Sequence, residues 1–137
     1  MSDMTGAMAF FDACETGQGW AACRQYCTPD ATFSAQADAL SGIDSLEAYT
    51  NWMTDMVAMM PDARFEMLAV GVDQDRNAIV AAAIFHATHT GEGGPVPPTG
   101  KAVSTNYCYV MSLRGGKIAH MIKIWNDGDA LRAAGWQ

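Results

Sequence analysis

The feature that most constrains the fold is the second half of the chain, where β-branched and aromatic residues run in long stretches broken by short turns. This pattern predicts four strands, over residues 64–73, 77–90, 102–114 and 117–126. The connections at residues 74–76 (QDR) and 115–116 (GG) are too short for anything but hairpins. The sheet is therefore expected to be mainly antiparallel.

Both faces of this predicted sheet are apolar. On the strand at 77–90 one face carries Ile79, Ala81, Ala83, Phe85, Ala87 and His89, and the other carries Val80, Ala82, Ile84, His86 and Thr88. On the last strand Met121, Lys123 and Trp125 share one face, and Ile118, His120, Ile122 and Ile124 share the other. An antiparallel sheet with one face in water alternates apolar with polar residues instead. Helices can cover one face, and we expect a second copy of the chain to cover the other, which predicts a homodimer through the sheet with His86 and His120 packed in the interface.

The first half of the chain reads as helices and one short strand. Helical spacing covers residues 5–16 and 20–27, and a strand is expected at 31–36. A longer helix begins after Asp44 or Ser45 and ends before Pro61. Its apolar stripe consists of Tyr49, Trp52, Met53, Met56 and Met60. A terminal helix is expected at 127–134, and Trp136 beyond it is expected to pack on the domain or its partner. Residues 1–137 are thus expected to form a single α+β domain.

Composition excludes several classes of function. The formal net charge is -7 and the 8 Lys and Arg residues are spread along the chain, so nucleic acid is not an expected partner. No apolar run approaches the length of a membrane span and no leader pattern is present, so we expect no membrane partner and a cytoplasmic protein. The four cysteines lack zinc or redox spacing and are interpreted as buried free thiols, although Cys23 and Cys27 at helical spacing leave a metal alternative open. We assign no metal and no cofactor.

Two motifs carry a resemblance to a known family. Residues 85–91 (FHATHTG) are followed by 97–101 (PPTGK), and a turn at 116–118 (GKI) leads to 123–126 (KIWN). This pattern resembles the SnoaL-like polyketide cyclase family of the nuclear transport factor 2-like superfamily. The resemblance covers nearly the whole chain and implies a cone: a curved, mainly antiparallel sheet wrapped around about three helices, with the active site inside.

The resemblance also implies positions for catalytic groups. Ketosteroid isomerases, which share the implied fold, carry a base aspartate where this chain has Ala35 and an oxyanion tyrosine near Phe10 or Phe11. The cyclases carry a catalytic aspartate where this chain has Tyr109. A phenol with a pKa near ~10 donates a hydrogen bond at neutral pH and does not accept a proton. The carboxylate base of both enzyme types is thus absent from its expected position.

The inward strand positions nevertheless predict a site. His89, Tyr107, Tyr109 and Lys123 are expected to converge in the cone, with Gln36 close by and walls of Trp52, Met56, Phe85 and Trp125. Desolvation there is expected to lower the pKa of Lys123, because the sequence shows no inward carboxylate to oppose it. The alternatives are a Lys123 that reaches solvent, a His89 that only anchors a loop, and tyrosines that only pack. The loop at residues 91–98 is either a lid or a rigid turn.

Two functions follow from this site. The first is a cyclase, isomerase or dehydratase acting on a polyketide-like or other cyclic ketone by acid–base chemistry. In it Lys123 and Tyr109 stabilise an enolate and His89 moves the proton. The alternative is a non-catalytic homodimer that binds a small apolar ligand in the same pocket.

Overall fold

The computed structural model describes residues 2–137, so Met1 of the expected domain lies outside the described residues. Five strands form one sheet in the order β1-β5-β4-β3-β2. They are β1 (Cys27–Gln36), β2 (Arg64–Asp73), β3 (Ala78–Thr88), β4 (Ala102–Arg114) and β5 (Lys117–Trp125). The pairs β2/β3, β3/β4 and β4/β5 are antiparallel, and β1 lies parallel to β5. The prediction of a mainly antiparallel sheet is confirmed.

The first strand is longer than the sequence pattern suggested. Helix α2 (Trp20–Cys23) is followed by a single 3-10 turn, η1 (Arg24–Tyr26), and β1 begins at Cys27. The expectation of a helix over residues 20–27 is therefore wrong at its end, and Cys23 and Cys27 do not share a helix face. Pro29 can lie within β1 because β1 is an edge strand, where a missing N–H leaves no neighbour unpaired. The pairing of β1 with β5 is irregular between Cys27 and Thr32, around this proline.

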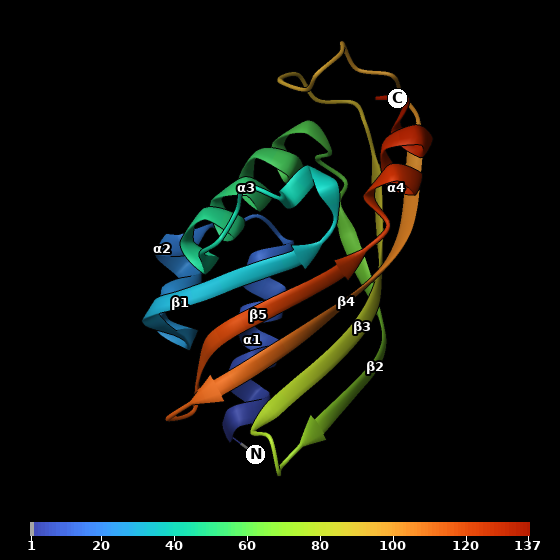
Figure 1. Cartoon of the computed structure of the whole chain (residues 1–137). Helices are drawn as coiled ribbons and strands as arrows, with labels where there is room; N and C mark the ends of the chain where they lie inside the picture. Colours follow the sequence, from blue (N-terminus) through green and yellow to red (C-terminus); the bar gives the residue numbers. More distant parts are fainter. Residues whose placement is uncertain (1) are drawn as a thin grey trace.

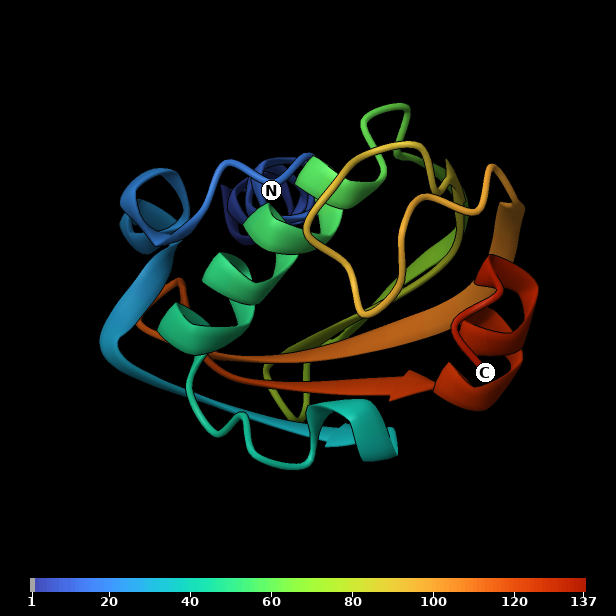
Figure 2. The same cartoon turned by 90° about the horizontal axis from the view of Figure 1, so that it is seen from above.

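Three helices cover one face of the sheet, as Figure 2 shows: α1 (Ser2–Glu15), α2 and α3 (Leu46–Met59). The Ser45 side chain caps α3 by accepting a hydrogen bond from the backbone N–H of Ala48 at 3.1 Å. A short 3-10 turn, η2 (Asp38–Leu40), precedes it, and α4 (Asp127–Ala134) follows β5. The C-terminus and the loop after β3 lie at the same end of the molecule (Figure 1). None of the helices within residues 2–137 is long and apolar enough to cross a bilayer.

The inner face of the sheet forms the core, and its alternation is largely the predicted one. Ile79, Ala81, Ala83, Phe85 and Ala87 of β3 are all buried against the helices. Ile118 is an exception, because it was expected on the outer face and is only 1% exposed. The register of β4 against β5 shifts between Ser112 and Leu113, so Leu113 pairs with Ile118 and the alternation changes there.

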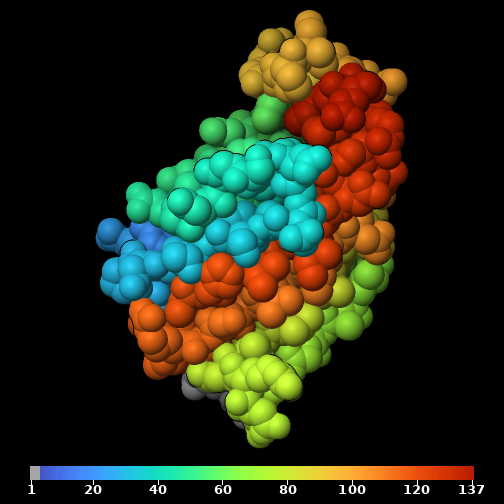
Figure 3. All heavy atoms as spheres, viewed as in Figure 1, coloured from blue at the N-terminus to red at the C-terminus, as the bar shows by residue number. Residues whose placement is uncertain are grey.

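The outer face of the sheet carries no helix and is viewed in Figure 3. Of the described residues on this face, Leu68, Val80 and Ile124 are large, apolar and exposed, and Leu68 and Ile124 are each about half accessible. An outer hollow lies here, lined among others by Gln36, Leu68, Ala82, Asn106, Cys108 and Ile124. His86 and His120 also lie on this face. His86 bonds to Ser104 and Glu66, and His120 bonds to Thr32 and Ser34.

Candidate functional site

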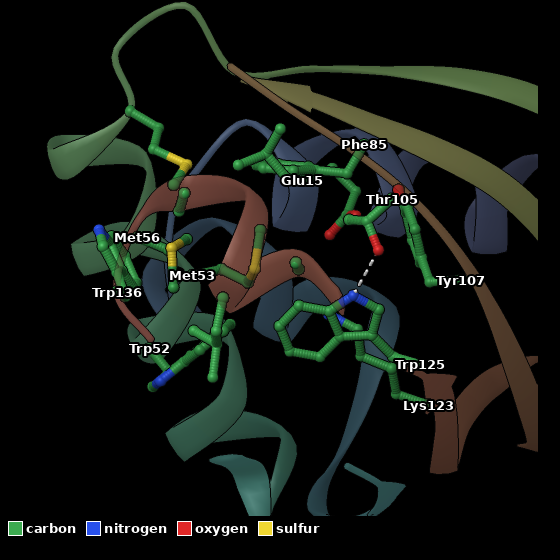
Figure 4. Close-up of a pocket in the computed structure, with 15 residues that line it drawn as sticks. Glu15, Trp52, Met53, Met56, Phe85, Thr105, Tyr107, Lys123, Trp125 and Trp136 are labelled. Carbon is green, nitrogen blue, oxygen red and sulfur yellow. Dashed lines mark hydrogen bonds between the residues drawn. The ribbon is translucent and has the colours of Figure 1, made fainter. Parts of the chain in front are cut away.

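A partly open cavity lies between the inner face of the sheet and the helices α1, α3 and α4 (Figure 4). It offers about 40 Å³ to the centres of water molecules, which is room for a few waters. Most of its wall is apolar, and its polar lining residues are Glu15, Thr105, Tyr107 and Lys123. Of the residues predicted from the sequence, Trp52, Met56, Phe85, Tyr107, Lys123 and Trp125 line it.

Lys123 projects from β5 into this space. It pairs across the sheet with Tyr109 of β4 and with Ala35 of β1, so its side chain lies on the inner face. The residue is 5% exposed, which excludes the alternative of a lysine that reaches solvent. Its Nζ lies 4.3 Å from the ring centroid of Trp125. Four further rings lie within 5.9 Å of Nζ, those of Tyr49, Trp52, Tyr107 and Tyr109. Such a cage stabilises a cation that has lost its water.

A chain of hydrogen bonds joins Lys123 to Glu15. Nζ of Lys123 donates to the hydroxyl of Tyr49 at 2.9 Å, and the hydroxyl of Tyr109 donates to Oε2 of Glu15 at 2.7 Å. The two hydroxyls lie 2.6 Å apart. Because the single proton of Tyr109 points to Glu15, the proton of Tyr49 must point to Tyr109. All bonds therefore run in one direction, from the amine to the carboxylate.

Glu15 is the residue that the sequence analysis missed. It is the last residue of α1 and is 1% exposed. The statement that no carboxylate faces inward is therefore wrong. A signal was present, because Glu15 lies four positions after Phe11 and eight after Ala7, both of which are fully or almost fully buried. Positions at this spacing share one face of a helix.

Burial opposes charge on both Lys123 and Glu15, the two ends of this chain of hydrogen bonds. Burial lowers the pKa of Lys123 to about 8, and the negative charge of Glu15 acts in the opposite sense. Burial raises the pKa of Glu15, while Lys123 and the tyrosine hydroxyls lower it. The expected direction for Lys123 is confirmed. The pair is thus closer than usual to its neutral form, in which Glu15 holds the proton and Lys123 is a free amine.

Tyr107 presents an unused donor to the cavity. Tyr107 lines the cavity together with Lys123, and its buried hydroxyl lies close to the Glu15 carboxylate but forms no hydrogen bond of good geometry with any described residue. It lies near enough to Glu15 for the carboxylate to raise its pKa, after the larger effect of burial. A buried hydroxyl without a partner costs about 1–3 kcal/mol. A ligand oxygen in the cavity would remove that cost.

The other predicted site residues lie elsewhere. Tyr109 is buried behind the cavity wall and reaches the site only through Glu15 and Tyr49. His89 does not line the cavity either. Gln36 lies on the outer face, because its neighbour Ala35 is the residue paired with Lys123 and successive strand residues alternate. The proposed cluster of Lys123, Tyr109 and His89 around one cavity is therefore not what the structure shows.

His89 anchors the loop and the C-terminus. Its Nδ1 accepts hydrogen bonds from the backbone N–H of Thr99 at 3.3 Å and from Nε1 of Trp136 at 2.9 Å. Trp136 in turn lines the cavity, and the expectation that it packs on the domain is confirmed. The loop-anchoring alternative for His89 is thus the one that its contacts support.

Gly91 and Gly100, the glycines of the two sequence motifs, also help to hold the loop after β3 in place. The N–H of Gly91 donates to the carbonyl of Met59 at 2.8 Å, and a Cβ on Gly91 would collide with the carbonyl oxygen of Ala58. Gly100 has a φ of 70° and donates to the carbonyl of His89 at 2.8 Å. The motif residues 89–91 and 99–101 therefore fix the loop against the end of α3.

Metal ligation finds no support in the described residues 2–137, where no group of three His, Cys, Asp or Glu side chains is arranged around a common point. The cysteines are free thiols, with Cys14, Cys23 and Cys27 buried and Cys108 partly exposed. Burial raises the pKa of both Cys23 and Cys27 to about 12. These thiols pack as small apolar groups.

A curved sheet with helices on one face and an apolar cavity between them defines an α+β protein of the nuclear transport factor 2-like class. The family model of the SnoaL-like polyketide cyclases matches residues 5–134. The chain belongs to the SnoaL-like polyketide cyclase family.

Solved structures agree with this assignment. A candidate SnoaL-like polyketide cyclase from Jannaschia sp. CCS1 superposes with a TM-score of 0.81 at 17% identity, over 99% of this chain and 93% of that one. IdmH from Streptomyces antibioticus gives 0.78 at 17%, over 98% and 99%. A protein of ketosteroid isomerase-like fold from Catenulispora acidiphila, in complex with trimethylamine, gives 0.71 at 15%, over 96% and 93%. These identities establish the fold alone. No curated protein matches the sequence.

Proposed function

We propose that this protein is an acid–base enzyme that moves a proton next to the carbonyl group of a polyketide-like or other cyclic ketone, as a cyclase or isomerase. The observation that carries the proposal is the buried pair of Lys123 and Glu15, linked by two tyrosine hydroxyls at the wall of an apolar cavity. Proton transfer needs a group that can both release and accept a proton near neutral pH. A lysine with a pKa of about 8 satisfies that need.

The roles differ from those first expected. Lys123 replaces His89 as the proton carrier, because Lys123 lines the cavity and His89 does not. Tyr107 replaces Tyr109 as the donor to the developing enolate oxygen, because Tyr109 donates to Glu15, whereas the Tyr107 hydroxyl has no hydrogen bond of good geometry among the described residues. A donor aimed at an oxygen that gains charge lowers the barrier. Glu15, which also lines the cavity, supplies the carboxylate that the family resemblance placed elsewhere, and Tyr109 and Tyr49 link it to Lys123.

The apolar wall supports a small, mainly hydrocarbon ligand. Flat rings can lie between Trp52, Phe85 and Trp125, and the flexible side chains of Met53 and Met56 can adapt to different shapes. Trp136 of the C-terminal segment also forms part of this wall.

A panel of cyclic ketones tests the proposal. Binding is followed by the fluorescence of the tryptophans, because Trp52, Trp125 and Trp136 all line the cavity. Catalysis is followed by NMR as exchange of the hydrogens next to the carbonyl in deuterated water. We expect both binding and accelerated exchange for at least one ketone, and loss of exchange in Lys123→Met. Binding without exchange would instead identify the protein as a non-catalytic carrier of the same ligands.

We also propose that the protein is a homodimer through the outer face of its sheet. Leu68, Val80 and Ile124 expose apolar surface there, and the other face is covered by the chain's own helices. A second copy is the economical cover, since most soluble oligomers are symmetric dimers.

A further inference from the structure

We propose that the amine of Lys123 forms a covalent imine with the carbonyl carbon of small apolar aldehydes and ketones. The inference deepens the proposed function, because it takes the same ligand class and cavity and adds a bond between protein and ligand. The geometry that points to it is a lysine Nζ on the cavity wall, enclosed by aromatic rings and tied by hydrogen bonds to a buried carboxyl group.

An amine attacks a carbonyl only in its neutral form, so its proton must have somewhere to go. The hydrogen bonds between Lys123 and Glu15 already run in the direction that this proton must take, from the amine to the carboxylate. Glu15 takes the proton of Tyr109, Tyr109 takes that of Tyr49, and Tyr49 takes one from Lys123. Each proton moves along an existing bond of 2.6–2.9 Å, and the net charge of the cluster does not change. The product is a free amine and a protonated Glu15.

The imine step then balances within the cluster. The nitrogen lone pair forms a bond to the carbonyl carbon, a proton passes from nitrogen to oxygen, and a carbinolamine results. The proton stored on Glu15 returns along the chain to the departing hydroxyl, which leaves as water. The protonated imine that remains is balanced by the Glu15 carboxylate. Tyr107 is placed to donate to the carbonyl oxygen during the attack, because its hydroxyl lines the same wall and is unpaired among the described residues.

The other lysines of the chain lack this setting. Lys101 and Lys117 are exposed, and Nζ of Lys117 donates to the carbonyl of Gln25 at 2.6 Å. Exposed lysines stay protonated at neutral pH. A carbonyl reagent is therefore expected to select Lys123 over the other lysines near pH 8 or below.

The ionisable groups around Lys123 set the pH dependence. They are Glu15 and Cys14 of α1, Tyr49 of α3, and Tyr107 and Tyr109 of β4. Glu15 and Cys14 both raise the pKa of Lys123, Glu15 more strongly. Glu15→Gln removes the larger effect, so the amine should become neutral at a lower pH. Adduct formation should then extend to lower pH, a shift that a merely structural Glu15 would not produce.

The experiment uses two carbonyl probes on the whole protein. Acetylacetone reacts with amines to a product that absorbs in the near ultraviolet, which gives a rate at each pH. Cyclohexanone with borohydride leaves a stable secondary amine that peptide mapping by mass spectrometry can locate. In the wild type we expect Lys123 to be the single modified lysine, and a rate that rises through pH 8. Lys117→Met is the matched control and should react as the wild type does, whereas Lys123→Met should lose at least ten-fold in rate.

The outcomes separate this inference from the proposed function. Peptide mapping of the wild type needs no variant, so a misfolded Lys123→Met cannot hide the answer. If cyclohexanone exchanges its hydrogens but no adduct forms on Lys123, the imine is overturned and the acid–base function stands. If adducts appear equally on Lys101 and Lys117, the imine is also overturned. If no ketone binds or reacts at all, both proposals fail.

Discussion

The indole N–H of Trp136 donates a hydrogen bond to Nδ1 of His89 at 2.9 Å, and the two rings meet edge to face with centroids 5.0 Å apart. Because Thr99 also donates its N–H to Nδ1, that nitrogen is the acceptor and the proton of the neutral ring lies on Nε2. Nε2 is buried and finds no partner among residues 2–137. This contact ties the C-terminus, the loop after β3 and the cavity wall together.

Removal of residues 135–137 is expected to lower the melting temperature by several degrees, because Trp136 leaves the cavity wall and His89 loses a donor. Trp136→Phe keeps most of the apolar contact and loses the N–H, so it should destabilise by only about 1 kcal/mol. Calorimetry of both variants beside a deletion of Gln137 alone provides the measurement and its control. An unchanged melting curve after the three-residue deletion would show that Trp136 does not hold this wall in solution.

The stability difference between Lys123→Met and the wild type should depend on pH. The pKa of Lys123 is about 8 in the folded chain and about 10.4 in an unfolded one, so the unfolded state binds more protons between these values. This group's contribution to the free energy of unfolding of the wild type therefore rises with pH in that window. Below pH 8 the burial penalty is complete, at about 3 kcal/mol.

We expect the free energy of unfolding of Lys123→Met, minus that of the wild type, to be largest below pH 8 and to shrink as pH rises towards 10.5. Cysteines and tyrosines with raised pKa values also titrate at alkaline pH, but they are present in both proteins and largely cancel in the difference. Urea unfolding at several pH values gives this quantity. A difference that stays constant from pH 8 to 10.5 would contradict a buried, titrating lysine.

Tyr107 and Tyr109, two positions apart on the same face of β4, should respond differently to loss of the hydroxyl. Tyr109→Phe leaves Oε2 of Glu15 and the proton of Tyr49 without their partner, which should destabilise by about 1–3 kcal/mol and interrupt proton transfer. Tyr107→Phe breaks no hydrogen bond recorded within the described chain and should change stability by less than about 1 kcal/mol. It should instead weaken ketone binding about three- to ten-fold. Urea unfolding and fluorescence titration of both variants test this contrast, which equal effects on stability would refute.

Charge on the outer face should separate the proposed dimer. Leu68 and Ile124 are each about half exposed on that face and line the same outer hollow. Leu68→Glu with Ile124→Glu would place two carboxylates of each copy in the interface, where burial without a partner is unfavourable. Analytical ultracentrifugation should show a dimer for the wild type and a monomer for the double variant. Glu47→Gln on α3 serves as the control, and a wild-type monomer at micromolar concentration would refute the interface.

The strands show how far local pattern can lead. Residues 64–73 and 102–114 were predicted with the bounds that the structure has, because β-branched runs between Gly, Asn and Asp turns mark strands by themselves. Ile118 was predicted on the wrong face, because the register shift at Leu113 depends on how two strands pair and not on either strand alone. Cys27 was predicted in a helix and lies in β1, because its pairing partner in β5, Ile118, lies ninety-one positions later in the sequence.

For the candidate site, too, some features follow from the sequence and others only from the fold. The sequence by itself determined that Lys123 and Trp125 share a face, that Phe85 lies on the inner face of its strand, and that the chain resembles its family, since these depend on residue spacing and motif. Only the tertiary structure decided that Glu15 lies within reach of Lys123, that Tyr49 and Tyr109 bridge them, and that His89 bonds to Trp136. Each of these contacts joins residues from different elements. Whether a carboxylate stays in water or is buried beside an amine depends on what the rest of the fold places over it, and no local pattern contains that information.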